Sequence, residues 1–238
     1  MKAVLVIPAL NEEDSIGRVL GEVPPGLFDQ VFVVDNGSTD ATAARASARG
    51  ATVFHEPRRG YGNACLRALR ALPPDTDVVV FMDGDGSDVP AEASGLLGPI
   101  TEGQADLVLG SRRLDRSERG SLGLAQRLGN RLATGLIGLI YKHRYTDLGP
   151  FRAIRRSSLA GLGMRDPNYG WTVEMQIRAL EQGLIVQEIP VSYRRRRAGA
   201  SKVSGSLWGG LAAGAKILWL ILRLSRGVER REPLKRKP

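Results

Sequence analysis

Apolar and polar residues alternate in blocks along the first half of the chain. Short apolar runs, typical of buried strands in a parallel sheet, occur at Ala3–Ile7, Gln30–Val34, Ala51–Phe54, Asp77–Met82 and Leu107–Leu109. Between the first four runs, residues near 16–20, 41–49 and 63–72 have the apolar spacing of amphipathic helices. Because strands and helices alternate with short connections, the pattern predicts an α/β fold with a Rossmann-like, mostly parallel sheet flanked by helices on both faces.

The second half of the chain has a different pattern. It predicts two more strands, at Thr146–Ile154 and Ile185–Tyr193, and helices at Leu122–Tyr141, Thr172–Gln182 and Leu207–Leu224. No internal repeat and no long linker separates the chain into two folded units. We therefore expect one domain over residues 1–206, followed by an amphipathic helix and a basic tail at residues 207–238.

Polar clusters follow three of the predicted strands, at Pro8–Glu12, Asp35–Asp40 and Asp83–Asp88. Ligands of open α/β sheets bind beyond the carboxyl ends of the strands, so we expect these clusters to form one crevice. Asp83-Gly84-Asp85 can hold a hard divalent cation beside a diphosphate, although a solvated surface turn would have the same composition.

Two further features fit a nucleotide site. A carboxylate at Asp35 can accept hydrogen bonds from a base or ribose, or can cap the next helix. Gly60 and Gly62 would let the backbone approach a phosphate at a helix N-terminus, but such a short glycine pair is weak evidence.

Charge is distributed unevenly along the chain. Residues 1–111 carry 8 Lys/Arg and 16 Asp/Glu, whereas residues 112–238 carry 26 Lys/Arg and 9 Asp/Glu. An acidic half that binds a cation and a basic half that meets an anion would explain this asymmetry. Nucleic acid, a phosphorylated substrate and a membrane surface are the candidate anions. A single cysteine, Cys65, excludes a disulfide framework and a cysteine-rich zinc site.

The C-terminal segment favours a membrane surface. Its longest uncharged run is about 13 residues, shorter than the roughly 20 that span a bilayer. Trp208 and Trp219 suit an interface, and a basic tail follows. We interpret the segment as an in-plane helix attracted to anionic lipid; packing on the domain, or pairing with Leu122–Tyr141 across a homodimer interface, are the alternatives.

The strings VIPALNEE (6–13), VVDNGSTD (33–40) and DGD (83–85) together resemble family 2 glycosyltransferases of the GT-A fold. GPFR (149–152) and GASK (199–202) are similar to the polyprenyl-phosphate sugar transferases, the dolichol-phosphate mannose synthase group. The resemblance runs in order from residue 3 to about residue 205. The chain departs from the mannose synthases where they have DPMSGFR, and the donor sugar and base, UDP or GDP, stay open.

The resemblance implies roles for individual residues. Those at the nucleotide are Pro8, Leu10, Asn11, Glu12, Asp35, Gly37, Gly62, Asp83 and Gly84. Asp83 and Asp85, with Ser87 where mannose synthases often carry Gln, would be ligands of Mg²⁺ or Mn²⁺. Arginines near the acceptor would be Arg112 and Arg127, and Arg196 and Lys202 would meet the diphosphate or the acceptor phosphate.

The acceptor decides what further chemistry is needed. A phosphate monoester is already ionised at neutral pH and needs positioning, whereas a hydroxyl needs a carboxylate base, for which Asp147 and Glu174 are the candidates. The abundance of arginine in the second half favours the phosphate. We therefore expect an inverting, metal-dependent transferase that moves a sugar from a nucleotide-sugar donor to a polyprenyl phosphate.

Two alternatives stay open. One is a family 2 transferase that acts on a glycan or small-molecule hydroxyl; the more distant one is a basic membrane- or nucleic-acid-binding protein without catalysis. The apolar run after Met1 is interrupted by Pro8 and Asn11, unlike a signal peptide. We accordingly expect a cytoplasmic protein, peripheral on the cytoplasmic face of an anionic membrane, with no nucleic-acid partner.

Overall fold

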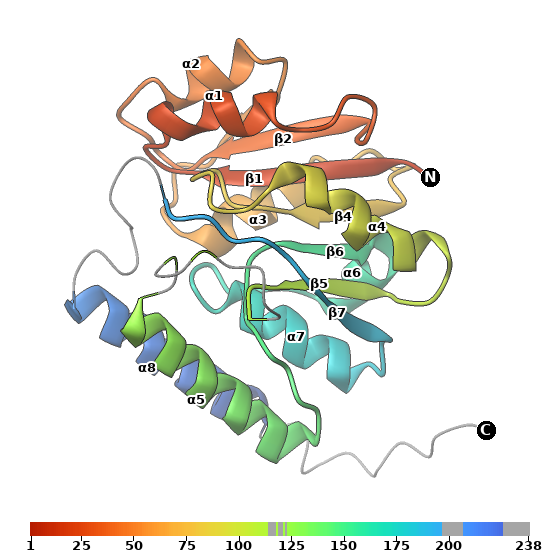
Figure 1. Cartoon of the computed structure of the whole chain (residues 1–238), viewed down its shortest axis with the longest axis vertical. Helices are drawn as coiled ribbons and strands as arrows, with labels where there is room; N and C mark the ends of the chain where they lie inside the picture. The colour runs from red at the N-terminus through yellow and green to blue at the C-terminus, as the bar shows by residue number, and fades with distance from the viewer. Residues whose placement is uncertain (114–117, 119–120, 122, 197–206, 226–238) are drawn as a thin grey trace.

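The computed structural model describes residues 1–113, 118, 121, 123–196 and 207–225. The described residues form one seven-stranded sheet in the order β3-β2-β1-β4-β6-β5-β7 (Figure 1). Its strands are β1 (Ala3–Ala9), β2 (Gln30–Asp35), β3 (Thr52–His55), β4 (Val78–Phe81), β5 (Leu107–Ser111), β6 (Arg152–Arg155) and β7 (Val186–Pro190). All neighbouring pairs are parallel except those of β6, which runs antiparallel to β4 and β5.

The prediction of a strand over Thr146–Ile154 was wrong for its first part, because β6 begins only at Arg152. Pro150 has no N–H to donate to a sheet, and side chains of other elements bind the backbone of residues 146–148 instead. The antiparallel direction of β6 places its first residue at the edge of the sheet where the parallel strands end.

Helices cover both faces of the sheet. One face carries α1 (Glu13–Gly21), α2 (Thr42–Ser47) and α4 (Ala93–Thr101), and the other carries α3 (Tyr61–Leu69), α5 (Leu124–Tyr141), α6 (Arg156–Leu162), α7 (Trp171–Glu181) and α8 (Leu207–Ser225). Neither α4 nor α6 was predicted. The α4 sequence contains Gly95, Gly98 and Pro99, which conceal its helical pattern because glycine and proline are poor helix formers.

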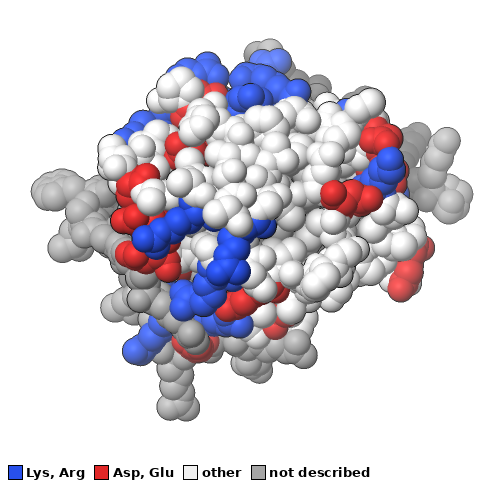
Figure 2. Space-filling model, turned by 90° about the horizontal axis from the view of Figure 1, so that it is seen from above, with Lys and Arg blue, Asp and Glu red and all other residues white. Residues whose placement is uncertain are grey.

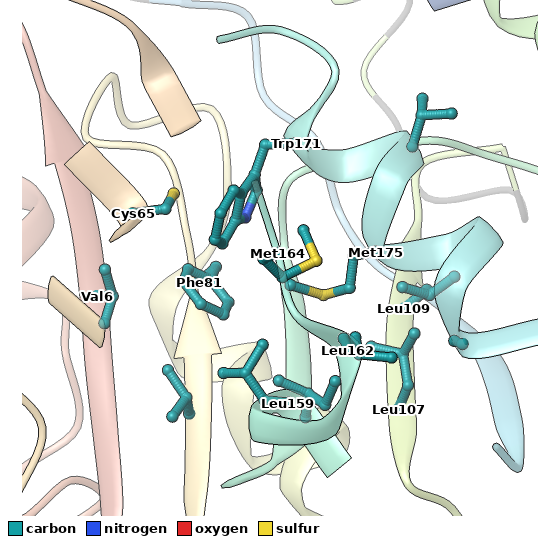
Figure 3. Close-up of a cluster of buried hydrophobic side chains, with 14 of the residues drawn as sticks. Val6, Cys65, Phe81, Leu107, Leu109, Leu159, Leu162, Met164, Trp171 and Met175 are labelled. Atoms are coloured by element: carbon teal, nitrogen blue, oxygen red, sulfur yellow. The ribbon is translucent and has the colours of Figure 1, made fainter. Parts of the chain in front are cut away.

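Alternate residues of each central strand contribute to two hydrophobic cores. Val79 and Phe81 of β4 pack on the α3 and α7 side, whereas Val78 and Val80 pack on the α1 and α4 side. Figure 3 shows the first core, where Trp171 lies against Phe81 with ring centroids 6.1 Å apart. Because both faces of the sheet are covered, its strands are apolar on both sides, as the sequence pattern predicted.

The C-terminal helix α8 packs on the domain. It lies beside α5 in Figure 1, contacts α5 and α7, and buries Ile221 in the same core as Trp171. The α5 and α8 helices therefore pair within one chain. Among the described residues no helix combines the length and apolarity needed to cross a bilayer. The basic tail beyond residue 225, like Lys202, lies outside the described residues.

Charges of both signs lie close together on the surface. Figure 2 shows Lys/Arg and Asp/Glu side chains next to one another on the face seen from above Figure 1, rather than in separate fields. Arg45 of α2, for example, lies 3.5 Å from the Glu13 carboxylate of α1 and 3.7 Å from that of Asp14. Surface pairs of this kind contribute little to stability. The buried charges at the strand ends are therefore the better guide to a functional site.

The glycines at the start of α3 permit a close contact between segments of the protein. A Cβ atom on Gly62 would lie 1.9 Å from the carbonyl oxygen of Asp166, and one on Gly60 would lie 2.2 Å from that of Pro167. The Asn63 N–H donates to the Pro167 carbonyl at 2.9 Å. The close approach seen at this helix N-terminus is thus to residues 166–168, whereas the phosphate role predicted for Gly62 stays a prediction.

We predict that Gly62→Ala lowers the free energy of unfolding by at least about 1–3 kcal/mol, because backbone atoms must move to admit the methyl group. Gly129→Ala in α5 is the matched control: its Cβ would meet nothing within 4 Å, and alanine should raise helix stability by up to about 1 kcal/mol. Urea unfolding measures both. A Gly62→Ala protein as stable as wild type would show that the contact with residues 166–168 is absent in solution.

Candidate active site

The polar clusters that follow β1 and β2 meet at one edge of the sheet. The Asn11 N–H donates to Ser38 Oγ at 2.9 Å, and the Thr39 N–H donates to Asn11 Oδ1 at 2.8 Å. Asn11 has a left-handed backbone with φ of 50°, a conformation that asparagine tolerates better than most residues. Asp35, at the end of β2, is buried and accepts from the Ser38 N–H at 2.9 Å. These bonds fix the two loops relative to each other.

Three carboxylates crowd the loop after β4, where Asp83 and Asp85 are partly buried and Asp88 is buried. Burial and the nearby charges of Asp85 and Asp88 raise the pKa of Asp83 well above its usual value. Burial and Asp85 raise the pKa of Asp88 to about 7. Its Oδ1 atom is buried without a hydrogen-bond partner among the described residues. The loop is therefore an electrostatic environment that favours a cation.

Arg196 brings the first and third clusters together. Its Nη2 lies 2.5 Å from Glu12 Oε1, and its Nε lies 3.1 Å from Asp85 Oδ2. Its neighbours have other roles: Arg194 pairs with Glu22 at 2.6 Å, and Arg195 is exposed. The segment is held beside the carboxylate loop because the Arg194 N–H donates to the Ser87 carbonyl at 2.8 Å.

A second arginine, Arg112, lies just beyond the end of β5 and is oriented by Asp147. Its Nε donates to Asp147 Oδ2 at 2.7 Å, and its Nη2 donates to Oδ1 at 2.8 Å, the two-bond geometry that defines a guanidinium's direction. The guanidinium also lies over the ring of Tyr193, 4.9 Å from the centroid. Burial acts to raise the pKa of Asp147, but the charge and hydrogen bonds of Arg112 hold it below its usual value.

Other predicted residues are placed less centrally. Glu174 of α7 is buried and accepts from the backbone N–H groups of Arg165 and Asp166, and from Arg178 Nε at 2.9 Å. Arg127 is exposed near the start of α5. Pro8 lies near the end of β1, and the loops at this edge carry Leu10, Gly37, Gly84 and Ser87. The Ser87 N–H donates to Asp85 Oδ1 at 2.9 Å, and the Gly84 carbonyl accepts from Ser15 Oγ. Their ligand roles stay predictions.

Three residues of this region were not predicted from the sequence. Asp88 was visible as a third acid after the Asp83–Asp85 pair, but its burial was not. Tyr193 forms a β-bridge with Asp88 and lies under Arg112, a contact that no local pattern could indicate. Glu188 of β7 accepts from the Thr146 N–H at 2.9 Å and so holds the segment that carries Asp147.

The donor set of the carboxylate loop fits a divalent cation that is shared with a ligand. Asp83, Asp85 and the unpartnered Oδ1 of Asp88 offer oxygen atoms, the ligands that Mg²⁺ and Mn²⁺ prefer. No group of three or more His, Cys, Asp or Glu side chains in the described part of the chain is arranged as a complete metal site. Mg²⁺ is commonly bound by one or two carboxylates together with substrate phosphates. The carboxylates of this loop could supply the protein ligands of such a site, and a bound phosphate would supply the others.

Comparison with known proteins identifies the family. The model of the glycosyl transferase family 2 matches residues 4–163. This chain belongs to family 2 of the glycosyltransferases. It is 39% identical over 213 residues to an uncharacterised glycosyltransferase of Mycobacterium tuberculosis, with 88% of this chain and 93% of that protein covered. It is 31% identical over 228 residues to the undecaprenyl-phosphate mannosyltransferase of Micrococcus luteus, with 88% and 90% covered.

A solved structure places the fold within the GT-A class. Glucosyl-3-phosphoglycerate synthase of Mycobacterium tuberculosis, in complex with Mn²⁺, UDP and phosphoglyceric acid, superposes with a TM-score of 0.77 at 25% identity, covering 94% of this chain and 78% of that one. The predicted GT-A fold, the family resemblance and the assignment as a glycosyltransferase enzyme are confirmed.

We predict that Asp147→Asn lowers the free energy of unfolding by about 3 kcal/mol at pH 7, because the largely buried Arg112 side chain would lose the charge of Asp147. The stabilisation by a carboxylate of lowered pKa is present above its unfolded pKa and is lost as pH falls through the folded value. The difference in free energy of unfolding between wild type and Asp147→Asn should therefore become smaller at acid pH. Urea unfolding at pH 7 and at pH 3 tests this; an equal difference at both would contradict it.

Proposed function

We propose that this family 2 glycosyltransferase moves a sugar, with inversion, from a UDP- or GDP-linked donor to a polyprenyl phosphate at a membrane surface. The observation that carries the acceptor assignment is the Arg112–Asp147 pair. Asp147, the candidate base in this region, is paired with an arginine and has a lowered pKa, so it is poorly suited to remove a proton from a hydroxyl. A phosphate monoester needs no base and benefits from an oriented guanidinium.

On the donor side, the residues at the ends of β1, β2 and β4 would bind the nucleotide. Asp35 and the loop from Leu10 to Glu12 would hold the base and ribose. A Mg²⁺ or Mn²⁺ ion held by Asp83 and Asp85 would supply charge neutralisation for the departing diphosphate. Arg196 neutralises Glu12 and Asp85 without a donor, and we infer that its guanidinium turns to the diphosphate when the donor binds.

The membrane partner is supported by exposed apolar side chains on the two packed helices α5 and α8, which we together call the docking face. Its side chains are 50–70% exposed: Leu128, Leu132 and Leu139 of α5, and Trp219 and Leu222 of α8. Arg127 and Arg131 are exposed on α5 as well, and Arg223 lies over the Trp219 ring at 5.1 Å. Neither helix contains an Asp or Glu. Leucines and tryptophan bordered by arginines suit the anionic cytoplasmic leaflet of a membrane.

A small-molecule acceptor is the second candidate. The similarity to glucosyl-3-phosphoglycerate synthase, whose complex holds phosphoglyceric acid, favours it. A soluble phosphorylated acceptor could bind the same Arg112, but it would not explain why the apolar side chains of the docking face are exposed. The non-catalytic alternatives are set aside because the chain belongs to a family of enzymes.

We predict metal-dependent transfer of labelled sugar from a UDP- or GDP-sugar into undecaprenyl phosphate, measured as organic-extractable product. EDTA should abolish it, and Asp85→Asn should lower it at least about 100-fold, because charge neutralisation of the leaving group is lost. Asp75→Asn, an exposed acid-to-amide change that removes a pair with Lys2, is the matched control and should leave transfer unchanged. Transfer to phosphoglyceric acid but not to the lipid would favour the second candidate.

We also predict that the protein floats with anionic phosphatidylglycerol vesicles in a density gradient and that salt weakens this binding. Leu132→Gln with Leu139→Gln should reduce binding by at least about tenfold, because each leucine would no longer bury its side chain in the bilayer. Ile185→Gln, another apolar residue that is 56% exposed but lies outside the docking face, is the control. Flotation that is equal for the double variant and wild type would refute the docking face.

A further inference from the structure

One side chain of α5, Asn130, connects this helix to the segment that carries Asp147. Its Nδ2 donates to the Thr146 carbonyl at 3.3 Å, and its Oδ1 accepts from the Leu148 N–H at 3.0 Å. Asn130 therefore binds the backbone on both sides of Asp147. An asparagine amide can do this because it has a donor and an acceptor on the same planar group.

The segment 146–148 is held from β5, β7, α7 and α5. Ser111 Oγ of β5 lies 2.6 Å from Thr146 Oγ1. Glu188 of β7 accepts from the N–H groups of Thr146 and Asp147, and Gln176 of α7 donates to the Asp147 carbonyl at 3.1 Å. Both β7 and α7 belong to the packed body of the domain. Asn130 is the contact that comes from α5, a helix whose outer face is exposed.

The Asp147 carboxylate couples the position of residues 146–148 to the orientation of Arg112. Its two oxygens accept from Arg112 Nε and Nη2, and Oδ2 also accepts from the Arg112 backbone N–H at 3.0 Å. A displacement of residues 146–148 would thus turn the guanidinium. Displacements near 1 Å can lower reaction rates by about 100-fold when a group must meet a reacting atom.

We propose that Asn130 is a positioning residue for the acceptor-side arginine. It ties Arg112 to the helix that carries Leu128 and Leu132, so that the guanidinium is held at a set position relative to the docking face. A phosphate that emerges from a lipid surface under α5 then meets an arginine already oriented toward it. This inference rests on the proposed function, which names Arg112 as the residue that meets the acceptor phosphate.

A double-mutant cycle tests whether Asn130 acts through Arg112. We expect Asn130→Ala to lower kcat/KM for undecaprenyl phosphate by about 10- to 100-fold and to leave the KM of the nucleotide sugar unchanged. In an Arg112→Ala background, Asn130→Ala should lower kcat/KM for undecaprenyl phosphate by less than about twofold, because the arginine that Asn130 positions is absent. The proposal would be overturned if Asn130→Ala lowered kcat/KM equally in both backgrounds. It would also be overturned if the KM of the nucleotide sugar rose by a similar factor.

Gln182→Ala is the matched control, since it also removes a side-chain amide that donates to a backbone carbonyl, that of Gly161, away from the segment 146–148. It should leave both kinetic parameters unchanged. Thermal unfolding of each variant identifies a general loss of stability, in which case the kinetic comparison is made at a temperature where all variants are folded.

Amide hydrogen exchange supplies a readout that does not depend on the acceptor. In Asn130→Ala the Arg112 amide should exchange at least about tenfold faster, as should the Leu148 amide, which keeps its bond to Asp147 Oδ1 at 2.8 Å and loses the one to Asn130. In Gln182→Ala neither amide should change. Unchanged exchange of both amides in Asn130→Ala would overturn the positioning role. Faster exchange in a protein that transfers no sugar to any phosphate acceptor would instead keep the positioning role and reject the proposed acceptor.

Discussion

The arrangement of this molecule depends on one electrostatic constraint: several carboxylates are gathered at the edge of the sheet where the parallel strands end. Asp83, Asp85 and Asp88 lie within six residues of one loop, and burial together with their mutual repulsion raises the pKa of Asp83 and Asp88. A protein keeps such a group ionised only with a compensating positive charge. In this structure Arg112 and Arg196 supply it: both charges act to lower the pKa of Asp83, and Arg196 also contacts Asp85 and Glu12.

The two arginines at this edge have different partners, and this separates the site into two sides. Arg196 lies among the carboxylates of the loops after β1 and β4, whereas Arg112 is paired with Asp147, which belongs to the segment before β6. The antiparallel direction of β6 makes the separation possible, because it brings the chain of residues 146–151 back to the edge where β5 ends. The two sides remain electrostatically coupled, because the charge of Arg112 also acts to lower the pKa of Asp83 and of Asp88 on the carboxylate loop.

Much of the fold could be predicted because its strands are buried on both faces and appear as short apolar runs. The convergence of Asn11, Ser38 and Asp85 on one edge followed from the parallel direction alone. The start of β6 at Arg152 could not be predicted, since Thr146 and Asp147 are bound by Glu188, which lies 42 positions from Thr146 in sequence. Asp88 and Tyr193 were missed for the same reason: their contact joins segments that local periodicity treats separately.

Asp147 shows how the contacts of a residue bear on a role that its residue type suggests. A carboxylate near an acceptor site is a reasonable candidate base, and its sequence position is compatible with that chemistry. Its partners favour the orienting role that we propose, because a carboxylate that accepts three bonds from one arginine has little tendency to take a proton. In the proposed reaction Asp147 orients Arg112, since its two bonds fix the direction of the guanidinium. A substrate that brings its own negative charge needs that direction more than it needs a base.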